Sequence, residues 1–124
     1  MNAPRFLVNI DVPNLATATR FYCEALGLTA GRRFGPHAQE LVGGPTDIYL
    51  LKKDAGTPSA PSDATDARDY ARHWSPVRLD FVIDDIDAAK AQALAAGATL
   101  EADTSAHRWG KLAMFADPWA MASA

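Results

Sequence analysis

The sequence contains very little cysteine: Cys23 is the only one among its 124 residues. A single thiol cannot close a disulfide within the chain, so a reducing compartment is the simpler expectation. The sequence also has no apolar run near the roughly 20 residues that a membrane-spanning helix needs. It shows no early segment with the basic start, apolar stretch and small-residue cleavage site of a signal peptide. These absences predict a cytoplasmic protein without a membrane partner.

An excess of positive charge is absent as well. The chain has 12 Lys and Arg against 15 Asp and Glu, a formal net charge of -3. Nucleic acids and anionic membranes attract strongly basic surfaces, and this balance argues against both as partners. What is present is a composition of 48% hydrophobic residues with 9% aromatics, enough for the core of one domain of this length. Small molecules or proteins are therefore the expected partners.

Two stretches of the sequence, residues 7–31 and 78–102, share one pattern. Each begins with about six residues in which apolar side chains occupy every second position, as in a strand. Each continues with a capping residue and apolar positions at helical spacing, and ends at a glycine, Gly27 or Gly97. The pattern predicts a strand followed by a helix in both stretches.

Short strand-like segments follow each predicted helix. They are residues 28–34, 37–42 and 47–52 after the first helix, and 99–103 and 111–116 after the second. The internal repeat therefore predicts an α+β fold of two modules, each a strand, a helix and three strands, with the last strand of the second module missing.

The modules are expected to form one domain. Module one covers about residues 4–53 and module two about residues 77–124. Between them, residues 54–76 are rich in Pro, Ser, Ala and Asp and are interpreted as a linker or lid, with a candidate short helix at 66–73.

The end of the first predicted helix carries an aromatic pair, Phe21 and Tyr22, followed by Leu26 and Gly27. The second module contains "FVIDDIDAA" and closes with "MFADP". With the repeated modules, these motifs resemble the vicinal oxygen chelate superfamily, which includes glyoxalase I, extradiol dioxygenases, fosfomycin-resistance enzymes and bleomycin-resistance binding proteins. The resemblance implies two βαβββ modules forming a cupped mixed sheet, and pairing of modules within one chain or across a homodimer. Because one scaffold hosts several chemistries, it does not specify an activity.

Enzymes of this superfamily usually hold a divalent metal with a histidine on the first strand of each module and a carboxylate on the last. Aligning the strand–helix junctions places Leu7 and Arg78 at the two histidine positions, where neither side chain binds a metal. Asp47 is the nearest carboxylate to the third position, and the fourth falls at or beyond Ala124. The three histidines, His37, His73 and His107, lie outside the predicted first strands. We therefore expect no metal cofactor, with a site built from displaced ligands as the alternative.

Strand alternation predicts which side chains face the cup. If Val8 and Ile10 face the helix, Asn9 faces the cup, and the same pattern in the second module places Arg78 and Asp80 there. A guanidinium oriented by a carboxylate can bind a carboxylate or phenolate through paired hydrogen bonds. The alternative interpretation is an ordinary ion pair on a solvated sheet face.

Aromatic side chains provide a second candidate set for the ligand site. Flat rings suit stacking on a planar ligand, although such residues also fill cores and edges. The candidates are Trp74, Trp109, Tyr49, Phe34 and, in the same segment as Trp109, His107.

These observations favour a metal-independent small-molecule-binding protein that sequesters an antibiotic or an aromatic metabolite, planar or anionic in character, and that forms a homodimer. The alternatives are a lyase or dioxygenase of the same superfamily with non-standard metal ligands, and a degenerate relative with a structural role.

The last residues, "DPWAMASA", have small residues where relatives carry a glycine turn and a final strand. Codons for Gly-His-Gly-Phe-Cys that lose one nucleotide can encode Ala-Met-Ala-Ser-Ala, the sequence with which the chain ends. We hypothesise that a frameshift has replaced the last strand. A genomic sequence with no strand-coding codons in another frame would contradict this hypothesis.

Overall fold

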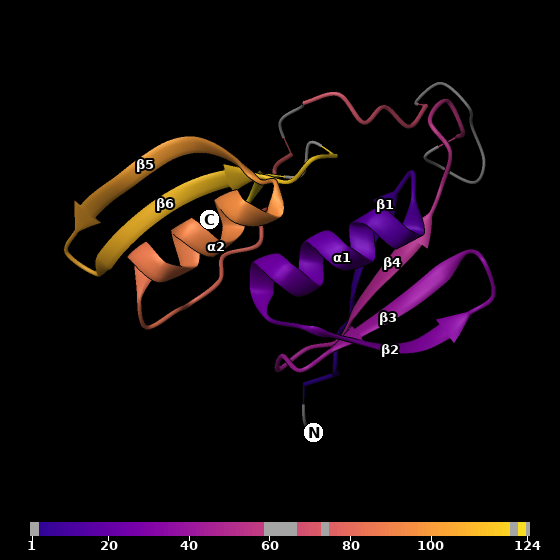
Figure 1. The fold of residues 1–124 in the computed structure, drawn as a ribbon, viewed down its shortest axis with the longest axis horizontal. Helices are drawn as coiled ribbons and strands as arrows, with labels where there is room; N and C mark the ends of the chain where they lie inside the picture. Colours follow the sequence, from indigo (N-terminus) through magenta and orange to yellow (C-terminus); the bar gives the residue numbers. More distant parts are fainter. Residues whose placement is uncertain (1–2, 59–66, 73–74, 120–121, 124) are drawn as a thin grey trace. The chain divides into compact units, whose positions relative to one another are not determined.

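A computed structural model describes residues 3–58, 67–72, 75–119 and 122–123. The chain divides into two compact units, which are described separately (Figure 1). The first unit comprises residues 1–23 and 27–69, and the second comprises residues 24–26 and 70–124. No helix in the described part of the chain is both long and apolar enough to cross a membrane.

The first unit follows the predicted order of a strand, a helix and three strands. Its elements are β1 (Val8–Val12), α1 (Leu15–Leu26), β2 (Thr29–Phe34), β3 (Ala38–Val42) and β4 (Ile48–Lys52). The strands form one mixed sheet in the order β1-β4-β3-β2, in which β1 runs parallel to β4 and the other neighbours are antiparallel. Helix α1 lies across one face of this sheet (Figure 1).

Local sequence explains where α1 begins and ends. The Asn14 side chain accepts a hydrogen bond from the Thr17 backbone N–H at 3.0 Å, which satisfies a helix-end donor. Gly27 ends the helix in the left-handed conformation, with φ of 68°. The helix buries one apolar stripe against the sheet. The buried residues of α1 are Leu15, Ala18, Phe21 and Tyr22, and those of the strands include Ile10, Val12, Leu41, Ile48 and Leu50.

The opposite face of the same sheet is not covered by α1, and we call it the open face. Asn9 lies opposite Tyr49 across the β1–β4 ladder, and Tyr49 lies opposite Glu40 across the β4–β3 ladder. Because side chains alternate along a strand, these three residues lie on the face away from the buried Ile10 and Leu50. The predicted orientation of Asn9, away from the helix, agrees with this register.

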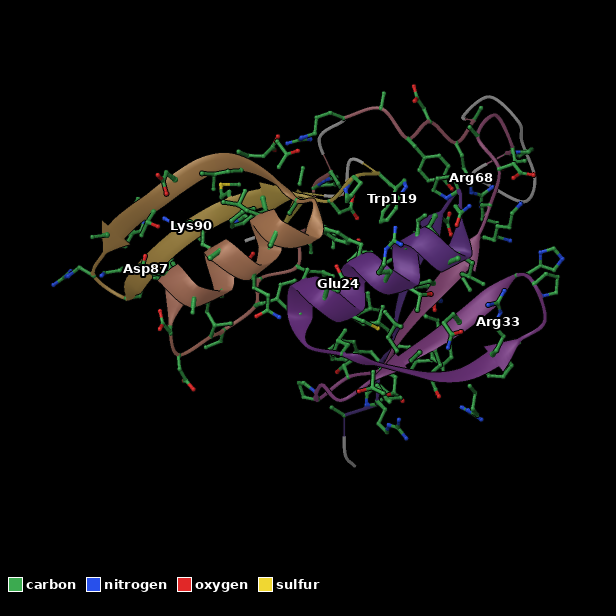
Figure 2. All side chains as sticks on the ribbon, viewed as in Figure 1. Glu24, Arg33, Arg68, Asp87, Lys90 and Trp119 are labelled. Carbon is green, nitrogen blue, oxygen red and sulfur yellow. The ribbon has the colours of Figure 1, made fainter. Side chains whose placement is uncertain are left out.

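The second unit contains α2 (Ile86–Ala96), β5 (Thr99–His107), β6 (Gly110–Ala116) and β7 (Ala122–Ser123). Its strands form an antiparallel sheet in the order β5-β6-β7. The Asp85 side chain caps α2 by accepting a hydrogen bond from the Ala88 N–H at 3.1 Å. Lys90 of α2, labelled in Figure 2, donates to Asp103 of β5 at 2.8 Å. Helix α2 and strands β5 and β6 lie at the predicted positions, although β5 extends beyond the predicted end at 103. The last strand, predicted to be missing, is present as the two residues of β7.

The predicted first strand of the second module is not formed. Among residues 78–83 only Leu79 makes a single bridge, and the expected core positions Phe81 and Ile83 are exposed. In the first unit the equivalent strand is held by five residue pairs with β4. In the described part of the second unit, strand β7, which corresponds to β4, spans two residues, and both of them pair with β6. Among the described residues, no strand forms a ladder with residues 78–83, and the strand pattern alone does not produce a strand there.

The helix predicted at residues 66–73 is not formed in the part of this range that the structure describes. Residues 67–72 contain no helix, and Ala67 instead bridges Pro58 in an antiparallel pair. The backbone of Arg68 exchanges hydrogen bonds with Thr57 and Gly56 at 2.8 and 2.7 Å. These pairings direct the backbone into an extended arrangement that competes with a helix.

Candidate functional site

A polar cluster of Glu40, Arg32 and Tyr49 lies on the open face of the first unit. The Glu40 side chain is only 8% exposed, and Arg32 Nη2 donates to its Oε2 at 3.0 Å. Arg32 Nε donates to Oε1 at 3.3 Å, so the guanidinium meets both carboxylate oxygens. The Tyr49 hydroxyl donates to Oε2 at 2.9 Å. The buried charge of Glu40 is therefore paired and hydrogen-bonded.

The backbone of β2 completes this cluster. The Arg32 backbone N–H donates to Glu40 Oε1 at 3.0 Å. Gly31 makes room for the carboxylate, because a Cβ added there would lie 2.5 Å from Glu40 Oε1. The register of β2 against β3 is irregular between Ala30 and Arg33, where this contact is made. The bulge and the glycine together allow the carboxylate to reach the β2 backbone.

These hydrogen bonds set the ionisation of the cluster. Donation from the Arg32 side chain, and then from its backbone and from Tyr49, lowers the pKa of Glu40 from 4.5 to about 2. The neighbouring carboxylate raises the pKa of the Tyr49 hydroxyl, and it also raises the pKa of Arg32. At neutral pH the cluster consists of a carboxylate, a guanidinium and a neutral phenol.

The lowered pKa predicts that acid destabilises the first unit through Glu40. Because the unfolded chain binds the Glu40 proton near pH 4.5 and the folded chain only near pH 2, the stability that Glu40 contributes is present above about pH 4.5. It is lost as the pH falls through about 2. Thermal unfolding measured between about pH 6 and 2 should therefore have a shallower acid slope in Glu40→Gln than in the parent protein. Identical slopes would contradict the assignment.

Aromatic rings lie beside this cluster. The Phe34 ring centroid lies 6.0 Å from that of Tyr49, with the planes tilted by 41°. Arg32 Cζ lies 5.3 Å from the Phe34 ring centroid, within the range of a cation–π contact. Phe34 is 46% exposed, so part of its ring is available to a ligand. The predicted candidates Asn9, Tyr49 and Phe34 are thus brought to one region of the sheet.

A second ion pair involves the end of β1. Arg68, labelled in Figure 2, donates from Nε to Asp11 Oδ2 at 2.9 Å. Its Nη1 donates to Thr57 Oγ1 at 3.2 Å and to the Pro58 carbonyl oxygen. Arg68 therefore links the segment after β4 to Asp11 of β1. Asp11 lies two residues after Asn9 on the same strand.

The candidates on the second unit form two groups. Arg78 Nε donates to Asp80 Oδ1 at 3.2 Å, and both residues line a shallow depression with Ser75 and Pro76. This ion pair was expected on a first strand, which is not formed, so it lies on an irregular segment instead.

The other group lies at the β5–β6 hairpin. The His107 and Trp109 rings stack with centroids 4.9 Å apart and planes within 1°. His107 Nε2 lies 2.8 Å from Ser105 Oγ. Trp109 is 70% exposed and presents an aromatic surface. Trp74, the remaining candidate, lies outside the described residues, as does His73.

Arg32 and Glu40 are not among the residues singled out from the sequence. Their meeting depends on which residues of β2, β3 and β4 lie opposite one another, and a single sequence does not specify that register. The available signal is a glutamate inside the otherwise uncharged strand segment "AQELV", because a strand carboxylate that becomes buried requires a partner.

Comparison with known families finds that a glyoxalase-like domain model matches residues 7–121. The chain belongs to the glyoxalase-like domain family. This match confirms the resemblance to the vicinal oxygen chelate superfamily that the sequence motifs indicate. A search among curated proteins finds no match.

Solved structures share the fold of this glyoxalase-like protein. A glyoxalase/bleomycin resistance protein/dioxygenase family enzyme from Burkholderia phytofirmans is 21% identical, with a TM-score of 0.73 over 94% of this chain and 92% of that one. TioX from a Micromonospora species is 14% identical, with a TM-score of 0.70 over 98% and 95%. A fosfomycin resistance protein from Listeria monocytogenes, solved with Mn(II) and a dihydroxypropylphosphonic acid, is 12% identical, with a TM-score of 0.70 over 99% and 88%. These likenesses confirm the α+β mixed-sheet fold.

The described residues do not fit the metal site implied by the wider superfamily. Among them, no group of three or more His, Cys, Asp and Glu side chains is arranged to hold a metal ion. On the open face, β1 presents Asn9 and β4 presents Tyr49. The nearest buried carboxylate is Glu40 on β3, and both of its oxygens already accept hydrogen bonds from Arg32. A cation there would have to displace the guanidinium.

Proposed function

We propose that this glyoxalase-like protein binds a small planar molecule without a metal ion, and that the open face of the first unit is its ligand surface. The observation that supports this proposal is the ordered Glu40–Arg32–Tyr49 cluster beside the partly exposed Phe34 ring. A flat aromatic surface next to fixed polar groups is the arrangement expected of a small-molecule site.

The proposed contacts on the first unit are Asn9, Tyr49 and Phe34. Taken by itself, the second unit carries two separate candidate ligand-binding groups, which we also propose: the Arg78–Asp80 pair and the stacked His107 and Trp109. Trp74 remains a predicted contact. The biological role we propose is sequestration of an aromatic metabolite or antibiotic in the cytoplasm.

A binding screen tests this function. Protein treated with a chelator should bind at least one compound of a panel of planar aromatic metabolites and antibiotics, with a Kd in the micromolar range. Quenching of tryptophan and tyrosine fluorescence measures this binding. Tyr49→Phe keeps the ring and removes the hydroxyl, and it should weaken binding by about tenfold or less, the scale of one hydrogen bond. Leu94→Ala, a change at an exposed position of α2, is the matched control and should leave binding unchanged.

Two results would contradict the proposal. One is the absence of binding at micromolar concentration across the whole panel. The other is stoichiometric Zn, Fe, Mn or Ni held with sub-micromolar affinity by the purified protein, which would favour a lyase or dioxygenase with non-standard ligands.

We also propose that the protein forms a homodimer. Phe81, Val82 and Ile83 are exposed in the second unit, with Val82 fully so, and form an apolar segment outside any strand. An exposed segment with apolar side chains of this kind favours association with another chain. Light scattering should give the mass of two chains, and a monomer at high concentration would contradict the proposal.

A further inference from the structure

The Glu40 carboxylate has no acceptor position left for a ligand. Its Oε1 accepts from the backbone N–H and from Nε of Arg32, and its Oε2 accepts from Arg32 Nη2 and from the Tyr49 hydroxyl. A carboxylate offers about four such positions in all. Glu40 is therefore a positioning residue, whose contacts fix where the Arg32 guanidinium lies.

Arg32 is held along one edge only. Nε and Nη2 face Glu40 and Tyr49, whereas Nη1 has no hydrogen-bond partner among the residues that the structure describes. The Arg32 side chain is 69% exposed, so the two Nη1 N–H groups are open to solvent. A guanidinium fixed by its other edge loses less conformational freedom when it binds a ligand.

An aromatic surface adjoins the Arg32 guanidinium. Arg32 Cζ lies 5.3 Å from the Phe34 ring centroid, and the Tyr49 ring lies 6.0 Å from that of Phe34. A ligand that stacks on the exposed part of Phe34 would lie beside the Arg32 guanidinium. The N–H groups of Nη1 belong to a cation, so they favour an anionic oxygen acceptor such as a carboxylate.

We infer that Arg32, held in place by Glu40, is the anion-binding residue of the open face, and that the ligand is a planar ring bearing a carboxylate. This inference rests on the proposed function and specifies its ligand class. Because the charge of Glu40 offsets that of Arg32, recognition depends on the directed Nη1 donors more than on net charge. A lysine at this position keeps the charge but lacks the fork of donors that binds both partners.

The test uses two probes of the same shape, 2-naphthoate and its uncharged analogue 2-naphthamide, titrated into the protein by NMR. The parent protein should bind the naphthoate about tenfold or more tightly than the naphthamide, as expected when charge-assisted hydrogen bonds are present. Arg32→Gln should remove this preference, and Arg32→Lys should keep little of it. Glu40→Gln should reduce the preference.

The neighbouring Arg33 provides the matched control. Its Nε donates to the Gly35 carbonyl oxygen at 2.9 Å, and it is labelled in Figure 2. Arg33→Gln removes the same charge from the next position of β2 and should keep the preference for naphthoate. If Arg32→Gln does not fold, Arg32→Lys decides the question alone.

Three outcomes overturn the inference: equal affinity of the parent protein for both probes, an equal loss in Arg32→Gln and Arg33→Gln, or no binding of either probe at millimolar concentration. None of these removes the proposed function, which fails only if the wider aromatic panel also shows no binding or the purified protein holds a tightly bound stoichiometric metal.

Discussion

Replacing Ile10 with alanine is expected to lower the free energy of unfolding of the first unit by about 2–5 kcal/mol. Ile10 lies in the middle of β1, is only 3% exposed and pairs with the buried Leu50 across the β1–β4 ladder. Alanine removes three carbons from this site and leaves a cavity that the sheet and α1 can close only in part. Urea denaturation followed by circular dichroism, with hydrogen exchange of the β1 and β4 amides, measures the effect.

The repeat supplies the matched control, Phe81→Ala. Phe81 occupies the position equivalent to Ile10 in the second copy, but it is 37% exposed and lies outside any strand. Although more carbon atoms are removed, the expected loss is about 1 kcal/mol or less, because a partly exposed side chain contributes little buried area. If Phe81→Ala destabilised the protein as much as Ile10→Ala, residues 78–83 would have to be packed as a core strand.

This contrast explains how far the sequence predicts the fold. The helix ends depend on neighbours along the chain, such as Asn14 with Thr17 and Asp85 with Ala88, and both helices were predicted correctly. Formation of a strand depends also on a partner that is distant in the sequence. Residues 7–12 and 78–83 share one pattern, yet only the first has β4 beside it.

The same reasoning applies to the candidate site. Alternation along β1 was enough to predict that Asn9 points away from the helix. The cluster beside it requires knowledge of which residues oppose one another on three strands, and of the bulge that brings Arg32 to Glu40. Tyr49 and Phe34 were therefore identified as candidates by residue type alone, whereas Arg32 and Glu40 were missed.

The residues on the open face also determine whether this face could bind a metal ion, as enzymes of the wider superfamily usually do. Glu40 supplies a carboxylate on β3, but Arg32 and Tyr49 occupy it fully. Converting such a carboxylate into a metal ligand would require losing the guanidinium, which would leave Tyr49 as its remaining side-chain partner. The fold is thus shared with metal-containing relatives, while the chemistry of this face is that of a preformed ion pair.

Gly31→Ala is expected to destabilise the first unit by about 1–3 kcal/mol, the usual cost of overpacking a filled site. The new Cβ would lie 2.5 Å from Glu40 Oε1 and 3.2 Å from Val42 Cγ1. Although Glu40 Oε1 is the end of a side chain, the Arg32 backbone donates to this oxygen and Tyr49 donates to Oε2, so the carboxylate is held in place. The carboxylate must leave these partners to make room, and thermal or urea unfolding measures the cost.

Gly44→Ala is the control for this substitution, because the nearest atom to its added Cβ is Leu28 Cδ2 at 3.6 Å, an ordinary contact. It should leave the stability of the first unit nearly unchanged. The decisive comparison is a double-mutant cycle with Glu40→Ala, which removes the atom that the new methyl group meets. Gly31→Ala should then cost less in the absence of Glu40 than in its presence. Additive effects would mean that the new methyl group does not meet the Glu40 carboxylate. They would contradict the inference that Gly31 makes room for this carboxylate.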